Sequence, residues 1–122
     1  MILVDTSVWI DHLRKSEAKL QKLLENDEVV SHPFVRLELA LGSIANRETV
    51  LANLALLPQV PTAQVDELFG LVELRKLYRR GIGITDLHLV ASALLDKSTL
   101  IWTRDQRLGD IADELGLRAA IP

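Results

Sequence analysis

The chain has 122 residues, of which 48% are hydrophobic and 25% are charged, with no cysteine and a formal net charge of −3. The absence of cysteine excludes disulfides, zinc–thiolate centres and cysteine nucleophiles, and the slightly acidic balance means that a nucleic acid would have to bind a local basic patch. No signal-peptide pattern and no apolar run long enough for a membrane span is visible. The sequence therefore predicts a cytoplasmic protein made of a single domain, residues 1–122, with a core of its own.

Short apolar runs alternate with amphipathic segments through the first half of the chain. The run Ile2–Val4 is apolar throughout, which is typical of a central strand covered on both faces. A proline in the first turn and a glycine after the last turn mark a helix between Pro33 and Gly42. The predicted elements are a strand at 2–4, a helix capped by Thr6 or Ser7, a helix at 17–25, a strand at 28–31, a helix at 33–41, a helix at 48–57 and a short strand at 59–60.

The second half begins with the longest predicted helix, which Thr62 would cap and which would run to Arg80 and end at Gly81. It carries two apolar stripes, more than one core face requires, so part of it is expected to form an interface, as in a homodimer. The stripes are Val65, Leu68, Phe69 and Val72, and Leu71, Leu74 and Tyr78. The remaining predicted elements are a loop at 81–84, a helix capped by Thr85 and reaching Lys97, a strand at 99–102, a helix at 104–115 and an edge strand at 117–121.

Helices that alternate with short apolar strands predict an α/β protein, with a central, mainly parallel sheet between two helical layers. In such sheets, functional sites form beyond the carboxyl ends of the strands. Asp5 directly follows the first predicted strand, and Asp105 follows the strand that ends at Trp102. Both carboxylates are therefore expected at the same edge of the sheet.

Two further acids lie in apolar helical segments. Asp86 falls in the first turn of its predicted helix, where the helix dipole favours an anion. Glu38 has Phe34, Val35 and Leu41 as its helical neighbours, so its side chain is expected to point inward or toward the edge of a cleft. No regular set of lysines or arginines accompanies the four acids.

Four carboxylates gathered in one place would require a cation. Two like charges about 4 Å apart repel by roughly 4 kcal/mol at an effective dielectric constant near 20. A few such pairs rival the whole stability of a domain, which is about 5–15 kcal/mol. With oxygen ligands only, Mg²⁺ is the expected ion and Mn²⁺ the alternative. Metal-activated water that attacks a phosphodiester is the chemistry that such a centre would support.

Each acid taken alone has a simpler interpretation. Asp5 could serve only as the N-cap of the helix that follows it, and Glu38 could be a solvated helix residue. Asp86 and Asp105 could be first-turn acids that interact only with a helix dipole. The combination, with two of the four placed directly after apolar strands, is what indicates a functional site.

Four segments carry a resemblance to a known family. They are residues 2–10 (ILVDTSVWI), 36–39 (RLEL), 85–91 (TDLHLVA) and 102–108 (WTRDQRL). In this order they resemble the motifs of PIN-domain ribonucleases, and most closely those of the VapC toxins of bacterial VapBC type II toxin–antitoxin modules. The resemblance covers nearly the whole chain, and its first and last motifs are the most specific.

The resemblance implies a PIN-like α/β/α sandwich and an endoribonuclease that depends on Mg²⁺ or Mn²⁺ to hydrolyse RNA. It also implies a homodimer and a cognate VapB-like antitoxin that inserts a segment over the active site. The four acidic positions of the family fall on Asp5, Glu38, Asp86 and Asp105. The chemistry of the residues agrees: Asp5, Asp86 and Asp105 would hold the metal, and Glu38 would either ligate a second ion or steer the attacking water. The supporting hydroxyl positions fall on Thr6, Ser7 and Thr103.

Basic residues near the last motif are candidates for contact with RNA. Arg104 and Arg107 flank Asp105 and are predicted to contact the RNA backbone. The alternative is solvated helix charge, which fits Arg107 slightly better. Arg79 and Arg80 end the longest predicted helix, where the helix dipole and solvent account for them.

Three other classes of protein remain as alternatives. An aspartate-nucleophile phosphatase would require an acid two residues after Asp5, where Ser7 stands. A receiver-like phosphoacceptor domain would require a mid-chain aspartate after a strand and a late lysine after another, and Asp105 occupies the latter region. The third is a non-catalytic PIN-fold protein that only binds a partner, and the presence of all four acids argues against it.

Overall fold

Three short parallel strands form the central sheet of the computed structural model, which describes residues 1–122. β1 (Ile2–Val4) lies in the middle, between β2 (Val29–Val30) and β3 (Leu100–Trp102). Leu3 on β1 pairs with Ile101 on β3. Because all three strands run in the same direction, their carboxyl ends meet at one edge of the sheet, as the sequence predicts.

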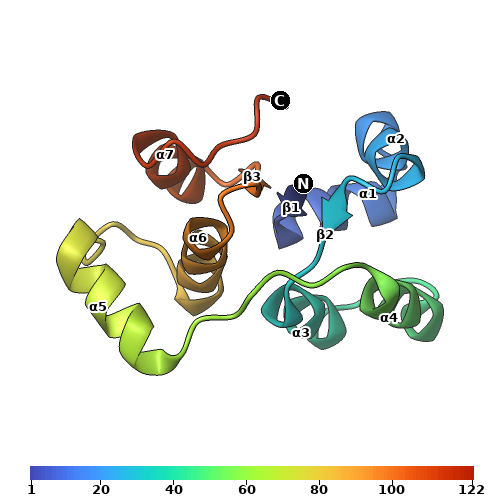
Figure 1. Cartoon of the computed structure of the whole chain (residues 1–122). Coiled ribbons are helices and arrows are strands. Elements are labelled where there is room, and N and C mark those ends of the chain that lie inside the picture. Colours follow the sequence, from blue (N-terminus) through green and yellow to red (C-terminus); the bar gives the residue numbers. More distant parts are fainter.

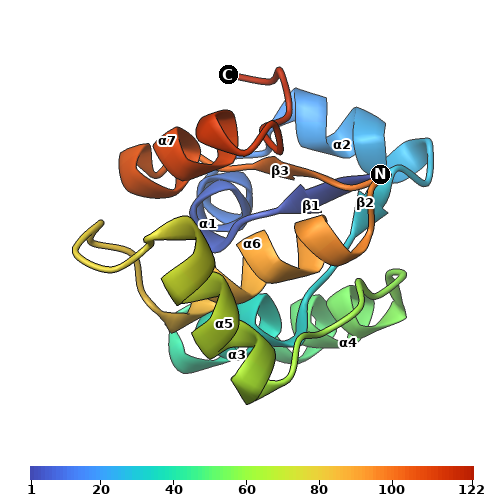
Figure 2. The same cartoon turned by 60° about the vertical axis from the view of Figure 1, so that its left-hand side comes forward.

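Seven helices surround this sheet (Figure 1). They are α1 (Thr6–Arg14), α2 (Ala18–Glu25), α3 (Pro33–Leu41), α4 (Arg47–Leu56), α5 (Val65–Arg75), α6 (Ile84–Leu95) and α7 (Gln106–Glu114). Figure 2 shows α2 and α7 above the sheet, and α6 with α3, α4 and α5 below it. The predicted three-layer α/β/α arrangement is therefore confirmed. None of the helices combines the length and the apolar character that crossing a membrane requires.

The core is one continuous cluster of side chains packed on both faces of the sheet. Leu3, Ile101 and Trp102 are fully buried in the strands. On α6, Leu89 and Val90 are fully buried as well, so this helix lies deep in one helical layer. Packing of this kind fixes the ends of β1 and β3 and the start of α6, and these are the places where three of the four acids stand.

The prediction of one long helix, capped by Thr62 and reaching Arg80, is wrong at both ends, because the observed helix α5 spans only Val65–Arg75. The next residue, Lys76, is the C-cap of α5, and its backbone is left-handed with φ of 53°. The turn brings Leu77 into the core, where it is 4% exposed. Burial of one leucine therefore overrides a local pattern that would otherwise continue as helix, and residues 76–83 form a loop.

Two predicted helix caps and one predicted helix start are corrected. Asp5, not Thr6 or Ser7, caps α1, and Gly83, not Thr85, precedes α6. The last helix is capped by Asp105 and starts at Gln106, two residues later than predicted. In the first and last cases an aspartate is the better cap because its carboxylate can accept the free N–H groups of the first turn.

The two weakest predicted strands are reduced to single bridges. Instead of a strand at 59–60, Gln59 pairs only with Ser31, and instead of a strand at 117–121, Arg118 pairs only with Ile101. The other predicted boundaries lie within about two residues of the observed ones, which is the usual uncertainty of element ends.

Replacement of the central strand leucine tests the packing of the sheet. We expect Leu3→Ala to lower the free energy of unfolding by about 2–5 kcal/mol, because the side chain is fully buried and leaves a cavity. The matched change Leu41→Ala removes a side chain that is 87% exposed and should cost less than about 0.5 kcal/mol. Denaturant unfolding measures both, and equal losses in the two variants would contradict the position of Leu3 in the core.

Candidate active site

Asp5 is the most buried of the four acids, at 4% exposed, and it stands directly after β1. Its Oδ1 accepts a hydrogen bond from the backbone N–H of Thr6 (2.7 Å), which is the helix cap of the simpler interpretation. Its Oδ2 accepts two more, from the hydroxyls of Ser7 (2.8 Å) and Thr103 (2.7 Å). Capping therefore accounts for one oxygen only, and the second accepts from one hydroxyl in the first turn of α1 and from another directly after β3.

Asp105 is joined to Asp5 through one shared hydroxyl. Thr103 Oγ1, which donates to Asp5, also accepts a hydrogen bond from the backbone N–H of Asp105 (3.0 Å). The carboxylate of Asp105 caps α7 by accepting from the backbone N–H of Leu108 (3.0 Å). Because Thr103 is 3% exposed and follows β3 directly, it ties the carboxyl ends of two strands together.

Glu38 reaches the site from α3 through another hydroxyl. Thr6 Oγ1 donates to Glu38 Oε1 at 2.6 Å. The residue is exposed rather than buried, and it lines a groove of about 470 Å³ whose walls include Ile10 and Leu13 of α1. Of the two predicted orientations for Glu38, inward or toward a cleft edge, the structure shows the second.

Asp86 lies in the first turn of α6, and the charges of the other three acids affect its pKa. Its pKa is raised from 3.8 to about 6, mainly by burial and next by the nearby charge of Asp5. Asp105 and Glu38 add smaller contributions, while a hydrogen bond from the backbone of Gly83 opposes them. The four negative charges that the sequence singled out therefore act on one another in the fold.

No basic side chain neutralises this group. The four salt bridges of the protein all lie elsewhere and join Arg80 to Glu114, Arg104 to Asp11 and to Glu17, and Arg118 to Asp113. As the side chains stand, no three His, Asp or Glu residues are grouped closely enough to hold a metal ion. The donor set itself, four carboxylates with hydroxyls and no cationic partner, nevertheless fits a hard divalent cation.

The two arginines beside Asp105 differ in what they contact. Arg104 forms salt bridges with Asp11 (2.8 Å) and Glu17 (2.6 Å) and lies over the ring of Trp102, so internal partners already satisfy its charge. Arg107 has no acidic partner and donates only to the carbonyl of a loop residue. Contact of either arginine with RNA stays a prediction, and the structure favours Arg107.

One contributor to the site was missed from the sequence. Gly83 precedes α6 and its backbone reaches the carboxylate of Asp86 three residues later. An acid at the third helical position that bonds back to the residue before the helix is a capping pattern, and the spacing Gly-Ile-Thr-Asp could have indicated it.

Comparison with known proteins agrees with this geometry. A family model described as the PIN domain matches residues 2–114, which include all four acids. The chain belongs to the PIN-domain family. It is 49% identical over 120 residues to proteins named Ribonuclease VapC32 from Mycobacterium tuberculosis, in strains CDC 1551 / Oshkosh and ATCC 25618 / H37Rv. Each match covers 98% of this chain and 97% of the relative, so the resemblance to VapC ribonucleases noted from the motifs is confirmed.

Removal of the Asp86 charge should stabilise the metal-free protein in a pH-dependent way. Because the pKa of Asp86 is raised from 3.8 to about 6, the folded state binds this proton more tightly than the unfolded chain. The contribution of Asp86 to stability therefore falls as the pH rises from about 4 to about 6. We expect Asp86→Asn to melt at the wild-type temperature near pH 4 and at a higher temperature above pH 6.

Thermal melts in EDTA across this pH range measure the difference between Asp86→Asn and the wild type. Asp66→Asn, which removes an exposed acid on α5, is the matched control and should show no such rise. A difference that stays flat or shrinks with increasing pH would contradict the raised pKa of Asp86, and with it the burial and the nearby carboxylates that cause it.

Proposed function

We propose that this protein is the endoribonuclease of a toxin–antitoxin pair and that Asp5, Glu38, Asp86 and Asp105 form its active site. One observation supports the proposal: in a PIN-domain fold the charges of Asp5, Asp105 and Glu38 all act on Asp86, and no lysine or arginine forms a salt bridge with any of the four. Their only available counter-charge is a bound cation, and a cation is what brings an RNA phosphate to an acidic surface.

The expected ion is Mg²⁺, with Mn²⁺ as the alternative, and Asp5, Asp86 and Asp105 would hold it. When bound, it would lower the pKa of a coordinated water and offset the charge that develops on the phosphate. Occupation of the site would also bring Asp86 to its ionised form, because a nearby positive charge lowers the pKa that its neighbours raise.

The remaining side chains would position the reacting groups. Thr6 holds one carboxylate oxygen of Glu38, and the other oxygen makes no hydrogen bond within the protein, so it can orient the attacking water and accept its proton. Ser7 and Thr103 keep the carboxylate of Asp5 fixed while its helix-capping oxygen stays bound to the backbone. The hydroxyls therefore act as positioning groups for two carboxylates.

Two partners follow from the same proposal. RNA would approach the strand ends, with Arg107 and to a lesser degree Arg104 near its backbone. A VapB-like antitoxin would cover the site, and the groove of about 470 Å³ beside Glu38, with apolar walls from Ile10, Leu13 and Ile44, is a surface that a segment of such a protein fits.

A homodimer is the third part of the proposal, and the exposed apolar residues of α5 support it. Val65 is 65% exposed and Phe69 is 68% exposed, one helical turn apart on the same face. Tyr78, counted in the sequence as part of the second stripe, lies on the loop beyond the helix. The receiver and phosphatase alternatives are set aside because the chain is a PIN domain, whereas the non-catalytic alternative is decided by the next experiment.

The variant Asp5→Asn tests the catalytic assignment. Asparagine is as good a helix cap as aspartate, so the fold should be retained while the negative charge is removed. We expect cleavage of a mixed RNA in Mg²⁺ or Mn²⁺ to fall by about a hundredfold or more, since even outer-shell partners of metal ligands are worth about 10–100-fold. EDTA should abolish wild-type cleavage, and Asp66→Asn should cleave as the wild type does. Full activity of Asp5→Asn would place catalysis at another site, and a wild type that does not cleave RNA would leave the non-catalytic alternative.

The variant Phe69→Ser tests the proposed dimer. Removal of an exposed aromatic side chain from the interface should raise the dimer dissociation constant by about tenfold or more. Light scattering across a dilution series measures the mass, with Leu56→Ser on α4, whose side chain is 83% exposed, as the matched control. A monomeric wild type, or an equal effect of both substitutions, would contradict the assignment of this interface.

A further inference from the structure

The loop between α5 and α6, residues 76–83, concentrates positive charge in an otherwise acidic protein. Together with the last residue of α5 it contributes four of the 14 lysines and arginines within six residues: Arg75, Lys76, Arg79 and Arg80. Only Arg80 has an acidic partner, because it forms a salt bridge with Glu114 (2.7 Å). The interpretation of Arg79 and Arg80 as helix-terminal charges is wrong, since α5 ends at Arg75 and both residues lie on the loop.

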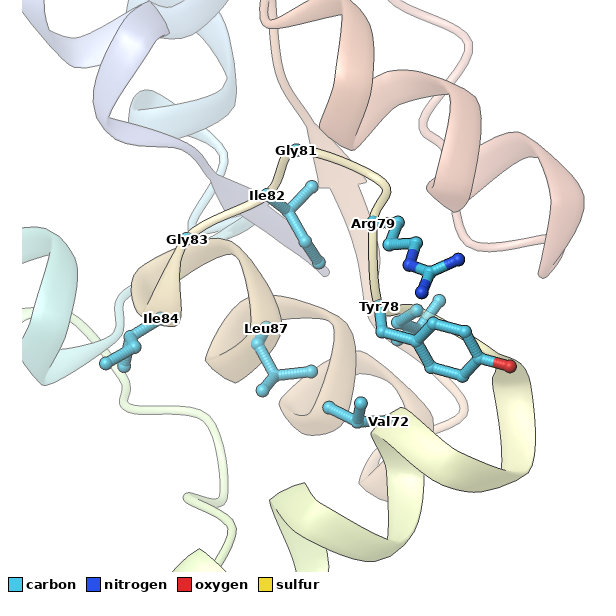
Figure 3. A pocket seen from close by; sticks show the side chains of 9 residues that line it. Val72, Tyr78, Arg79, Gly81, Ile82, Gly83, Ile84 and Leu87 are labelled. Atoms are coloured by element: carbon cyan, nitrogen blue, oxygen red, sulfur yellow. The ribbon is translucent and has the colours of Figure 1, made fainter.

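The same loop borders a pocket of about 270 Å³. Figure 3 shows Val72 and Leu87, from the two neighbouring helices, facing the loop across this pocket. Tyr78 is 50% exposed at its rim, and the ring of Tyr78 and the side chain of Arg79 project from the same part of the loop. An apolar floor with an exposed aromatic ring and a cation at its rim suits a flat, anionic ligand.

The pocket adjoins the acidic site through one residue. Gly83 lines the pocket and directly precedes α6, and Asp86 stands three residues later in the first turn of that helix. A ligand chain that crosses the acidic site at Asp86 therefore meets the pocket on the other side of Gly83. The pocket and Asp86 therefore lie on either side of the start of α6.

Arg107 adds a second cation to this surface from α7. Its Nη1 donates to the carbonyl of Gly81 (3.3 Å), and its side chain lies directly against that glycine. A Cβ atom at Gly81 would stand 2.9 Å from Arg107 Cδ, and the backbone there has φ of 79°, so the position favours glycine for both reasons. Glycine at this point lets the guanidinium of Arg107 reach the loop.

We propose that Tyr78, Arg79 and Arg107, here called the loop surface, bind the nucleotide of single-stranded RNA next to the scissile phosphate. The base stacks on Tyr78 over the pocket, and Arg79 and Arg107 contact the adjoining phosphates. This inference rests on the proposed ribonuclease function. RNA is favoured over a protein partner because the cations of the loop surface have no acidic partners, while the pocket accepts a flat apolar group.

Binding to RNA can be tested separately from cleavage. In the background Asp5→Asn, which should not cleave, the affinity for a fluorescent single-stranded RNA of mixed sequence is measured without added metal over a range of KCl concentrations. Tyr78→Ala should weaken binding by about tenfold, and Tyr78→Phe should restore it, because the aromatic face is retained. Arg79→Asn, chosen because asparagine tolerates the left-handed backbone at this position (φ 61°), should lower the salt dependence by about 0.7 in slope, because the protein then neutralises one phosphate fewer.

The matched control is Lys22→Gln on α2, which Figures 1 and 2 both place on the far side of the molecule from α5. It removes one positive charge and should leave the affinity and the slope unchanged. In the otherwise wild-type enzyme, Tyr78→Ala should raise KM for RNA about tenfold with kcat unchanged, because the loop surface binds substrate beside the reacting phosphate.

The outcomes separate the two proposals. Suppose that the wild type cleaves RNA, that Asp5→Asn does not, and that the loop variants bind RNA as tightly as their parent. The proposal that the loop surface binds RNA is then wrong, and the proposed active site is retained. If the wild type does not cleave RNA, the proposed function fails whatever the loop variants do. If the loop variants change the oligomeric state or protein binding instead of RNA affinity, the surface is a protein interface and the inference is overturned.

Discussion

The site depends on one buried carboxylate that is held by the ends of two strands. Asp5 accepts from the backbone of Thr6 with one oxygen and from the hydroxyls of Ser7 and Thr103 with the other. The hydrogen bond from Thr103 spans 98 positions of the chain and joins the carboxyl end of β1 to that of β3. Two of the other acids are tied to this junction, because Thr103 also accepts from the backbone of Asp105 and Thr6 also donates to Glu38.

Hydroxyl groups, rather than arginines or lysines, therefore hold the carboxylates of Asp5 and Glu38. A hydroxyl can donate to a carboxylate without removing its negative charge, whereas a guanidinium would cancel the charge that attracts a cation. The arginine nearest in sequence, Arg104, is directed to Asp11 and Glu17 instead. Burial, and next the nearby charge of Asp5, raises the pKa of Asp86, so its ionised form lowers the stability of the fold when no cation is bound.

Much of the fold followed from local patterns. The apolar run Ile2–Val4, the Pro33 and Gly42 boundaries and the alternation of elements were sufficient for a parallel α/β/α sandwich, and the two strand ends brought Asp5 and Asp105 to one edge. The end of α5 could not be found in this way, because residues 76–80 contain no proline or glycine and only the burial of Leu77 turns the chain.

The hydrogen bonds of the site could not be predicted from the spacing of residues along the sequence either. Thr6 and Thr103 could be named as hydroxyl residues, but their bonds to Glu38 and Asp5 join positions 32 and 98 residues apart. The same holds for Arg104, whose acidic partners lie in α1 and just before α2. The cluster of basic residues could be found in the sequence, but its position could not. Because α5 ends at Arg75, Arg79 lies on a loop beside an apolar pocket near Asp86 and not at the end of a helix.

The most direct test of the account is the position of a metal ion. In crystals soaked with Mn²⁺, anomalous scattering should show a peak in contact with the carboxylates of Asp5, Asp86 and Asp105, and the peak should vanish in Asp5→Asn. A peak that lies elsewhere, or no peak among these side chains in well-ordered crystals, would contradict the claim that the four acids meet around a divalent cation.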